Sequence, residues 1–256
     1  MSAYANHVQL AELMKLELEP VGIYFGNTEA VCDLDAKPDR RNCVVPFLMT
    51  AAKGRSCSMT EETCNCAGGK VGCCFGDGFE RGRPTIHKML SQGYAEGEAP
   101  PGMPEHLRVG ERFYCDESLG LLWRESLPLS ERAYPRIVFA PLSKWDEIGQ
   151  PDLVFAFANP DQISAFVVML GFHNGRACNT IVPQCAACQS IMFAANEIDS
   201  DDPQAVMGLF DVSQRRPVLA NLLSMTMPYA VWEGMTHDLD KTFFHTHAWA
   251  EIAKRL

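Results

Sequence analysis

Residues 136–162 read RIVFAPLSKWDEIGQPDLVFAFANPDQ, and this stretch decides the fold class. Two short apolar runs, 136–142 and 152–158, are rich in β-branched and aromatic residues, a composition that favours buried strands. The second run leads directly into a helix, because Asn159 is a good N-cap and Pro160 suits the first helical position. Strands that alternate with helices predict a sheet with helices packed against it.

Elements of both kinds flank this stretch. Residues 7–18 have the apolar spacing of an amphipathic helix. Asn42 is the expected cap of a helix that begins at Cys43, and residues 182–197 predict a helix rich in small side chains. The remaining expected elements are strands at 20–27, 55–60 and 205–212, a helix start at Thr60, and closing helices at 227–239 and 245–256.

The pattern as a whole predicts an α/β or α+β fold. We expect a mixed sheet flanked by helices in one compact domain spanning residues 1–256. Residues 76–104 are rich in glycine and proline and predict a long irregular segment, a candidate lid. A cysteine-rich subregion, 40–105, overlaps that segment.

The composition excludes several classes of function. The net charge of −10 argues against a general nucleic-acid binder, because neutralising phosphates requires an excess of Lys and Arg. The first residues lack the basic and then apolar pattern of a signal peptide, and polar residues and proline interrupt the most apolar windows. We therefore expect a cytoplasmic protein without a membrane span, in which thiols stay reduced.

Cysteine is the most informative residue type in the chain. There are eleven, and CNCAGGKVGCCFG (64–76) contains four of them among four glycines. Together with Cys57, the spacing is Cys-x6-Cys-x-Cys-x6-Cys-Cys, which matches neither the ferredoxin run nor paired zinc knuckles. Clustered thiols in a reducing compartment favour metal ligation, and glycine lets the backbone approach a metal cluster closely. The alternative is that some of them are small buried hydrophobic residues.

Three further cysteines lie at expected helix starts. A thiolate at Cys43 would be favoured by the free N–H groups of the first helical turn. Cys185 and Cys188 form a Cys-x-x-Cys pair, which suits half of a metal site or a redox dithiol. The third alternative for this pair is the packing of two small residues.

Near the end of the chain, DVSQRR (211–216) places Asp211 close to Arg215. An arginine there is a candidate for holding a carboxylate or phosphate group of a ligand. A surface ion pair is the alternative interpretation.

The chain resembles the bacterial and archaeal family known as domain of unknown function 169. The motifs that carry the resemblance occur in the family's order and are listed here: LELEPVGIYFG (16–26), RRNCVVPFLMTAAKG (40–54), MTEETCNCAGG (59–69), VFAPLSKWDEIGQPDLVFAFANPDQ (138–162), FDVSQRR (210–216) and MTMPYAVWEGM (225–235). The resemblance covers roughly residues 10–235.

The resemblance implies that particular thiols matter. The first family cysteine falls on Cys43, the second on Cys64, and a later one on Cys188 or Cys185. Many members then have Cys-x-x-Cys-Arg, where this chain has DVSQR, so Arg215 is retained and the two thiols are absent. The substitutes that the sequence offers are Cys57, Cys66, Cys73, Cys74 and Asp211.

These observations predict a thiolate-metal protein, with an iron–sulfur cluster of the 4Fe–4S kind as the leading hypothesis. The expected ligands are Cys43, Cys64, Cys66 and Cys188, with Cys57, Cys73, Cys74 and Cys185 in reserve. The cluster would transfer electrons or activate a small ligand. The expected partner is therefore a redox protein or a small molecule. A homo-oligomer is also possible for such a protein. A structural zinc site and a metal-free cysteine redox enzyme are the two alternatives, which leaves open whether the protein is an enzyme.

Overall fold

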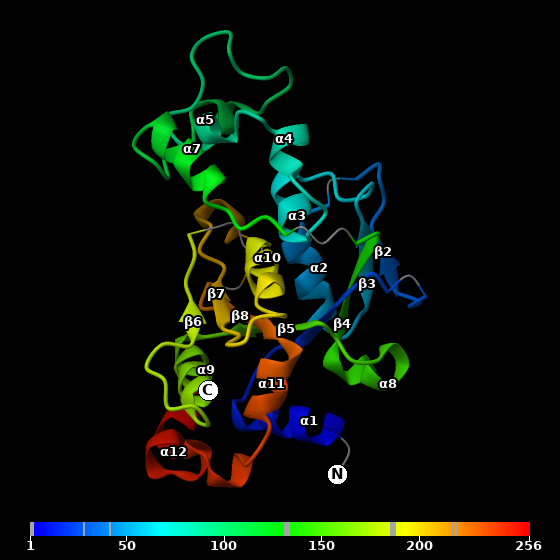
Figure 1. Cartoon of the computed structure of the whole chain (residues 1–256), viewed down its shortest axis with the longest axis vertical. Helices are drawn as coiled ribbons and strands as arrows, with labels where there is room; N and C mark the ends of the chain where they lie inside the picture. Colours follow the sequence, from blue (N-terminus) through cyan, green and yellow to red (C-terminus); the bar gives the residue numbers. More distant parts are fainter. Residues whose placement is uncertain are drawn as a thin grey trace.

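A mixed β-sheet runs through the protein and carries helices on both faces (Figure 1). The computed structural model describes residues 3–27, 29–40, 42–130, 134–184, 188–216, 218 and 220–256; for residues 3, 4 and 214 it describes the backbone alone. The architecture is the α/β domain that the sequence predicts, with one sheet and its covering helices.

The sheet of the described residues has eight strands in the order β2-β3-β4-β1-β5-β8-β7-β6. The inner pairs are antiparallel, and the outermost pairs, β2 with β3 and β6 with β7, are parallel. The strands are β1 (Val21–Phe25), β2 (Leu34–Asp35), β3 (Cys57–Thr60), β4 (Arg136–Pro141), β5 (Leu153–Ala158), β6 (Thr180–Ile181), β7 (Ala205–Gly208) and β8 (Leu223–Pro228).

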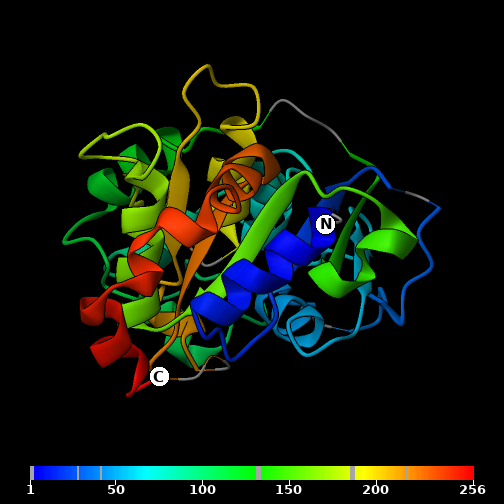
Figure 2. The ribbon, with the colours of Figure 1, turned by 90° about the horizontal axis from the view of Figure 1, so that it is seen from below.

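Two layers of helices bury the two faces of the sheet. One face carries α2, α3 and α10, and the other carries α1, α9, α11 and α12 (Figures 1 and 2). The helices are α1 (Ala3–Leu13), α2 (Val44–Ala51), α3 (Ala67–Gly72), α4 (Gly78–Gly82), α5 (Ile86–Leu90), α6 (Glu105–Arg108), α7 (Glu117–Glu125), α8 (Trp145–Ile148), α9 (Pro160–Gly171), α10 (Gln189–Asn196), α11 (Tyr229–Met235) and α12 (His247–Ala253). Four short 3-10 helices complete the described elements: Leu142–Lys144, Val212–Gln214, Leu239–Lys241 and Phe243–His245.

Strand β5 lies at the centre and is buried on both faces. Phe155 and Phe157 pack toward α2 and α10, whereas Val154 and Ala156 pack toward α1 and α9. A strand covered on both sides needs apolar residues at every position, which explains the continuous run LVFAFA. Hydrophobic burial of this strand therefore fixes the sheet between its two helical layers.

The helix that follows β5 begins as the sequence predicts. Asn159 Oδ1 accepts a hydrogen bond from Gln162 N (3.0 Å), and Gln162 Oε1 accepts one from Asn159 N (2.8 Å), which completes a capping box. Gln162 Nε2 also donates to Lys15 O (2.6 Å), in the turn after α1. The cap of α9 thus also anchors the end of α1.

The structure corrects several local expectations. The sequence predicts no strand at 223–226 and places residues 227 and 228 in the closing helix, whereas the structure has the strand β8 there. The prediction of a helix start at Thr60 is wrong, because Thr60 and Thr63 form a turn and α3 begins only at Ala67. Asn42 is not the cap of α2, because its side chain donates to Lys37 O and Thr63 O, and Cys43 takes the N-cap position.

The helix expected over 182–197 is shorter than predicted. It begins at Gln189, residues 182–184 are not helical, and residues 185–187 lie outside the described residues. Residues 76–104 contain α4 and the five-residue α5, so a continuous irregular segment is not confirmed. These helices, with α6 and α7, form a lobe above α3 and α10 in Figure 1, which we call the upper lobe (residues 78–130).

A buried histidine joins α1 to α11 on the face of the sheet that carries α1, α9, α11 and α12. His7 is 2% exposed, and its Nδ1 accepts a hydrogen bond from Trp232 Nε1 (3.0 Å). Its Nε2 lies 3.4 Å from the hydroxyl of Tyr229, which donates to Glu233 Oε1 (2.9 Å). Burial lowers the pKa of His7 below its ordinary value of 6.5, although the charge of Glu233 acts in the opposite direction.

This histidine makes stability depend on pH. The unfolded chain binds a proton at His7 more readily than the folded chain, so the free energy of unfolding should fall as pH drops below about 6.5. The slope should approach about 1.4 kcal/mol per pH unit for one group. In the His7→Asn variant this component of the slope should be absent, as measured by urea denaturation between pH 7.5 and pH 5.

The matched control is His247→Asn, because the His247 side chain is 89% exposed. That variant should keep the slope of the wild-type protein. Parallel pH profiles for the wild type and the His7→Asn variant would show that His7 does not control the acid sensitivity.

Candidate functional site

The cysteines gather around α3, a short helix with the sequence AGGKVG. A Cβ atom at Gly72 would lie 2.5 Å from Cys188 O, and one at Gly69 would lie 3.1 Å from Cys64 Sγ. Both distances are shorter than ordinary van der Waals contacts, so only glycine lets α10 and the Cys64 thiol approach so closely. We call the side of α3 formed by Gly68, Gly69 and Gly72 the glycine face.

Two buried thiols lie near each other beside this face. Cys64 and Cys73 are both 0% exposed, and each shifts the pKa of the other. The neighbouring Cys73 thiol lowers the pKa of Cys64, and the charge of Lys70 acts in the same direction, against burial. The neighbouring Cys64 thiol and burial raise the pKa of Cys73. Cys64 is therefore the thiol of the pair that favours the thiolate form.

Cys188 reaches the glycine face from the opposite direction. It is the N-cap residue of α10, and its Sγ donates to Gly68 O (3.3 Å). Cys74 follows Cys73 directly and is buried, with a φ of 59° that L-residues rarely adopt. Cys74 and Cys188 both help to raise the pKa of Cys73, and all four of these thiols are buried.

Two half-buried cysteines lie at neighbouring helix starts. Cys43 is the N-cap residue of α2 and Cys66 that of α3. A Cβ at Gly69 would lie 3.3 Å from Cys66 Cβ and 3.5 Å from Val44 Cγ2, the residue after Cys43. The starts of α2, α3 and α10 therefore all lie next to the glycine face.

Cys57 lies in a different environment. It is on β3, and its Sγ donates to Phe47 O (3.3 Å) in α2. Burial raises its pKa to about 12, and the other groups that act on it are Cys32, Arg55, Asp33 and Asp35. Cys57 is thus a protonated core thiol, and none of the cysteines around α3 is among its electrostatic neighbours.

The remaining predicted site residues fall outside this group. Cys185 lies outside the described residues. Arg215 donates to three main-chain carbonyls, Leu222 O (2.8 Å), Ala220 O (2.9 Å) and Leu209 O (3.2 Å). Asp211 accepts from Ser213 N and Ser213 Oγ. These contacts show that Arg215 and Asp211 stabilise the loop in which they lie. A ligand role for Arg215 stays a prediction.

The thiols are present as separate side chains. None of the ten described cysteines forms a disulfide. Within the described part of the chain, no three Cys, His, Asp or Glu side chains are already placed to hold a metal ion.

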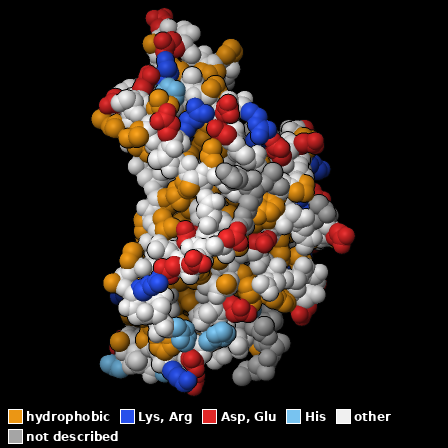
Figure 3. Space-filling view, viewed as in Figure 1, with side chains coloured by type: hydrophobic (Ala, Val, Ile, Leu, Met, Phe, Trp, Pro, Cys, Tyr) orange, Lys and Arg blue, Asp and Glu red, His pale blue; other side chains and the backbone are white. Residues whose placement is uncertain are grey.

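The upper lobe contacts described residues on both sides of Cys188 in the sequence. Trp123 Nε1 of α7 donates to Gln184 O (2.7 Å), and its ring packs 6.0 Å from that of Phe79. Asn196 Nδ2, at the end of α10, donates to Pro128 O (2.6 Å). Sequence reasoning missed Trp123, because only the fold brings α7 next to the segment that precedes α10. Figure 3 shows acidic side chains across the middle of this face, in keeping with the net charge of −10.

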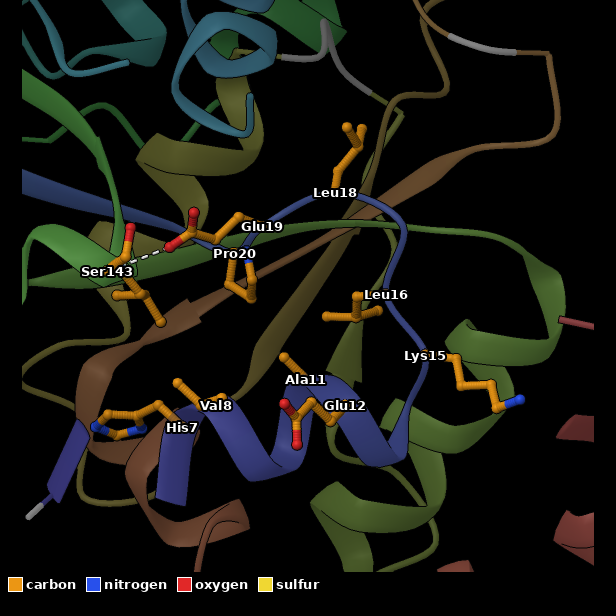
Figure 4. Close-up of a pocket in the computed structure, with 11 residues that line it drawn as sticks. His7, Val8, Ala11, Glu12, Lys15, Leu16, Leu18, Glu19, Pro20 and Ser143 are labelled. Carbon is orange, nitrogen blue, oxygen red and sulfur yellow. Dashed lines mark hydrogen bonds between the residues drawn. The ribbon is translucent and has the colours of Figure 1, made fainter. Parts of the chain in front are cut away.

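A separate pocket of about 350 Å³ lies against α1, on the opposite face of the sheet (Figure 4). Val8, Ala11 and Leu16 form much of its apolar wall. At its rim, Glu19 Oε1 accepts a hydrogen bond from Ser143 N (2.6 Å). The size suits a small molecule, but none of the predicted site residues lines it.

Comparisons with known proteins give one match. The model of the family domain of unknown function 169, described as "Uncharacterised ArCR", matches residues 9–237. The chain belongs to this family, as the resemblance indicates. No curated protein and no solved structure matches it. No helix among the described residues has the length and apolar character needed to cross a membrane.

The close contact between Gly72 and Cys188 should make the stability of the fold sensitive to a side chain at position 72. The Gly72→Ala variant should lose roughly 1–3 kcal/mol of unfolding free energy, because the new methyl group must displace the backbone of Cys188. Chemical denaturation measures this loss. Gly234→Ala is the matched control, since it lies in α11 with no atom within 4 Å of the added Cβ. It should leave stability unchanged or raise it by up to about 1 kcal/mol. Equal effects of the two substitutions would contradict the close contact.

Proposed function

We propose that this member of domain of unknown function 169 is a thiolate-metal protein whose cysteines around α3 bind an iron–sulfur cluster. The observation that carries the proposal is the burial of Cys64, Cys73 and Cys188 around α3, with Cys64 and Cys188 both packed against its glycine face. The cluster would transfer electrons or hold a small ligand at an open iron.

The chemistry of the surroundings supports thiolate ligation. Metal binding requires deprotonated cysteines, and the lowered pKa of Cys64 favours this form. Helix starts favour negative charge, and both α2 and α10 begin at a cysteine. The glycines of α3 allow main-chain N–H groups to approach cluster sulfurs, which tunes such sites.

The geometry orders the candidate ligands. Cys64, Cys73 and Cys188 are the first choices, because all three are buried around α3. Cys43 and Cys66, half-buried at the starts of α2 and α3, are the candidates for a fourth ligand. Cys74 and Cys185 remain in reserve. Cys57 ranks last, because it is a protonated core thiol.

Metal analysis of anaerobically prepared protein tests the proposal. After reconstitution with iron and sulfide, the protein should contain iron and acid-labile sulfide and should absorb visible light. Cys64→Ser, Cys73→Ser and Cys188→Ser should each lose most of the bound iron, because each removes a thiolate ligand. Cys115→Ser and Cys178→Ser are matched controls at exposed positions and should bind iron like the wild type.

Two other outcomes of the same measurement would replace the proposal. Zinc in place of iron, with a lower melting temperature after chelation, would identify a structural zinc module. A colourless protein that binds neither metal would leave a metal-free cysteine redox protein, the candidate that the paired thiols of Cys64 and Cys73 favour.

A further inference from the structure

We propose that the pocket against α1 binds a small aliphatic molecule that has one primary ammonium group. The pocket has a volume of about 350 Å³, which lies at the lower end of the range for small-molecule sites. It lies on the face of the sheet opposite to α3, so the proposal is independent of the proposed function and of any metal that the cysteines bind.

Hydrogen bonds hold the walls of this pocket in place. Lys15, with a φ of 52°, turns the chain after α1, so that residues 16–20 pass over the helix and leave the pocket between them (Figure 4). Gln162 Nε2 donates to Lys15 O (2.6 Å), and Leu142 N donates to Pro20 O (3.0 Å). A ligand therefore does not have to order this loop, which lowers the cost of binding.

The interior of the pocket is aliphatic. Its apolar lining residues are Val8, Ala11, Leu16, Leu18, Pro20 and Leu142. The described lining contains no Phe, Tyr or Trp, the rings that typically hold quaternary ammonium groups. The pocket therefore suits an aliphatic chain, and an ammonium group that binds through its N–H donors.

Two carboxylates give the pocket a negative charge. Glu12 is exposed on α1, and Glu19 is half-buried in the loop, where its Oε1 accepts a hydrogen bond from Ser143 N (2.6 Å). No described Lys or Arg forms an ion pair with either carboxylate. A primary ammonium group has three N–H donors for these oxygens, and charge-assisted hydrogen bonds are stronger than those between neutral groups.

The lysine of the lining does not neutralise this charge. Figure 4 shows the Lys15 side chain pointing away from the pocket. Its Nζ donates to Ala253 O (3.0 Å), a main-chain carbonyl at the end of α12. Lys15 is the only Lys or Arg among the described residues that line the pocket, so a ligand meets a negative charge. A cation is therefore favoured over a carboxylate of the same length.

Binding of 1-hexylamine to the full-length protein tests the proposal. Isothermal titration calorimetry measures its affinity at neutral pH and constant ionic strength. We expect one saturable site per chain, and binding of hexanoate and of hexyltrimethylammonium that is weaker by about tenfold or more, because hexanoate has the wrong charge and hexyltrimethylammonium has no N–H donor. Absence of saturable binding of hexylamine, or equal affinity for either analogue, would overturn the proposal.

Charge-matched variants locate the site. Glu19→Gln should weaken the binding of hexylamine by about tenfold, because Glu19 is half-buried, and Glu12→Gln by roughly two- to fivefold, because an exposed ion pair contributes less. Glu17→Gln removes the same charge at an exposed position outside the lining and should bind like the wild type. A Glu17→Gln effect as large as that of Glu19→Gln would assign the binding to net charge alone and contradict the site.

The Ala11→Leu variant tests the apolar part of the pocket. The larger side chain fills part of the volume and leaves both carboxylates in place, so binding of hexylamine should fall below detection while the melting temperature shows that the variant folds. Unchanged binding would refute the location. Self-association of the wild type that Ala11→Leu removes, measured by sedimentation, would assign the pocket to a second copy of the chain instead. The comparison of the three ligands on the wild type does not depend on any variant folding.

Discussion

The backbone of α3 lies against the first turn of α10 at a separation that leaves no room for a side chain. A Cβ at Gly72 would lie 2.5 Å from Cys188 O. Because α10 covers β5, β7 and β8, this contact couples the cysteine-rich segment to the centre of the sheet. The end of α10 then holds the upper lobe through Asn196 and Pro128. A side chain at residue 72 would therefore disturb the contact that links the sheet, the cysteines and the lobe.

The part of the fold that follows from local signals could be predicted from the sequence. Residues 136–162 contain two apolar runs and a strong helix cap, and each signal acts within a few residues. The strand β8 escaped prediction because its Met and Thr residues have a weak pattern and lead without a break into α11. The cap of α2 was misassigned because the Asn42 side chain binds carbonyls distant in sequence, which only the tertiary structure brings near.

The candidate site could be predicted only as a set of thiols. Spacing indicates that cysteines cluster, but it cannot tell which of them converge. Cys57 is closer in sequence to Cys64 than Cys73 is, yet its thiol donates to Phe47 O in α2. Cys73 meets Cys64 because α3 folds the chain back, and Cys188 joins them from a distant helix. The hydrogen bond from Trp123 to Gln184 O could not be predicted, because it depends on where α7 packs and no local pattern indicates that.

The two edges of the sheet limit how copies of the chain can pair strand to strand. The edge strands β2 and β6 are two residues long, and each runs parallel to its neighbour. A short edge offers another chain few unpaired N–H and C=O groups, which is how natural sheets resist edge-to-edge aggregation. Neither edge of the described sheet therefore offers a long template for strand pairing between molecules.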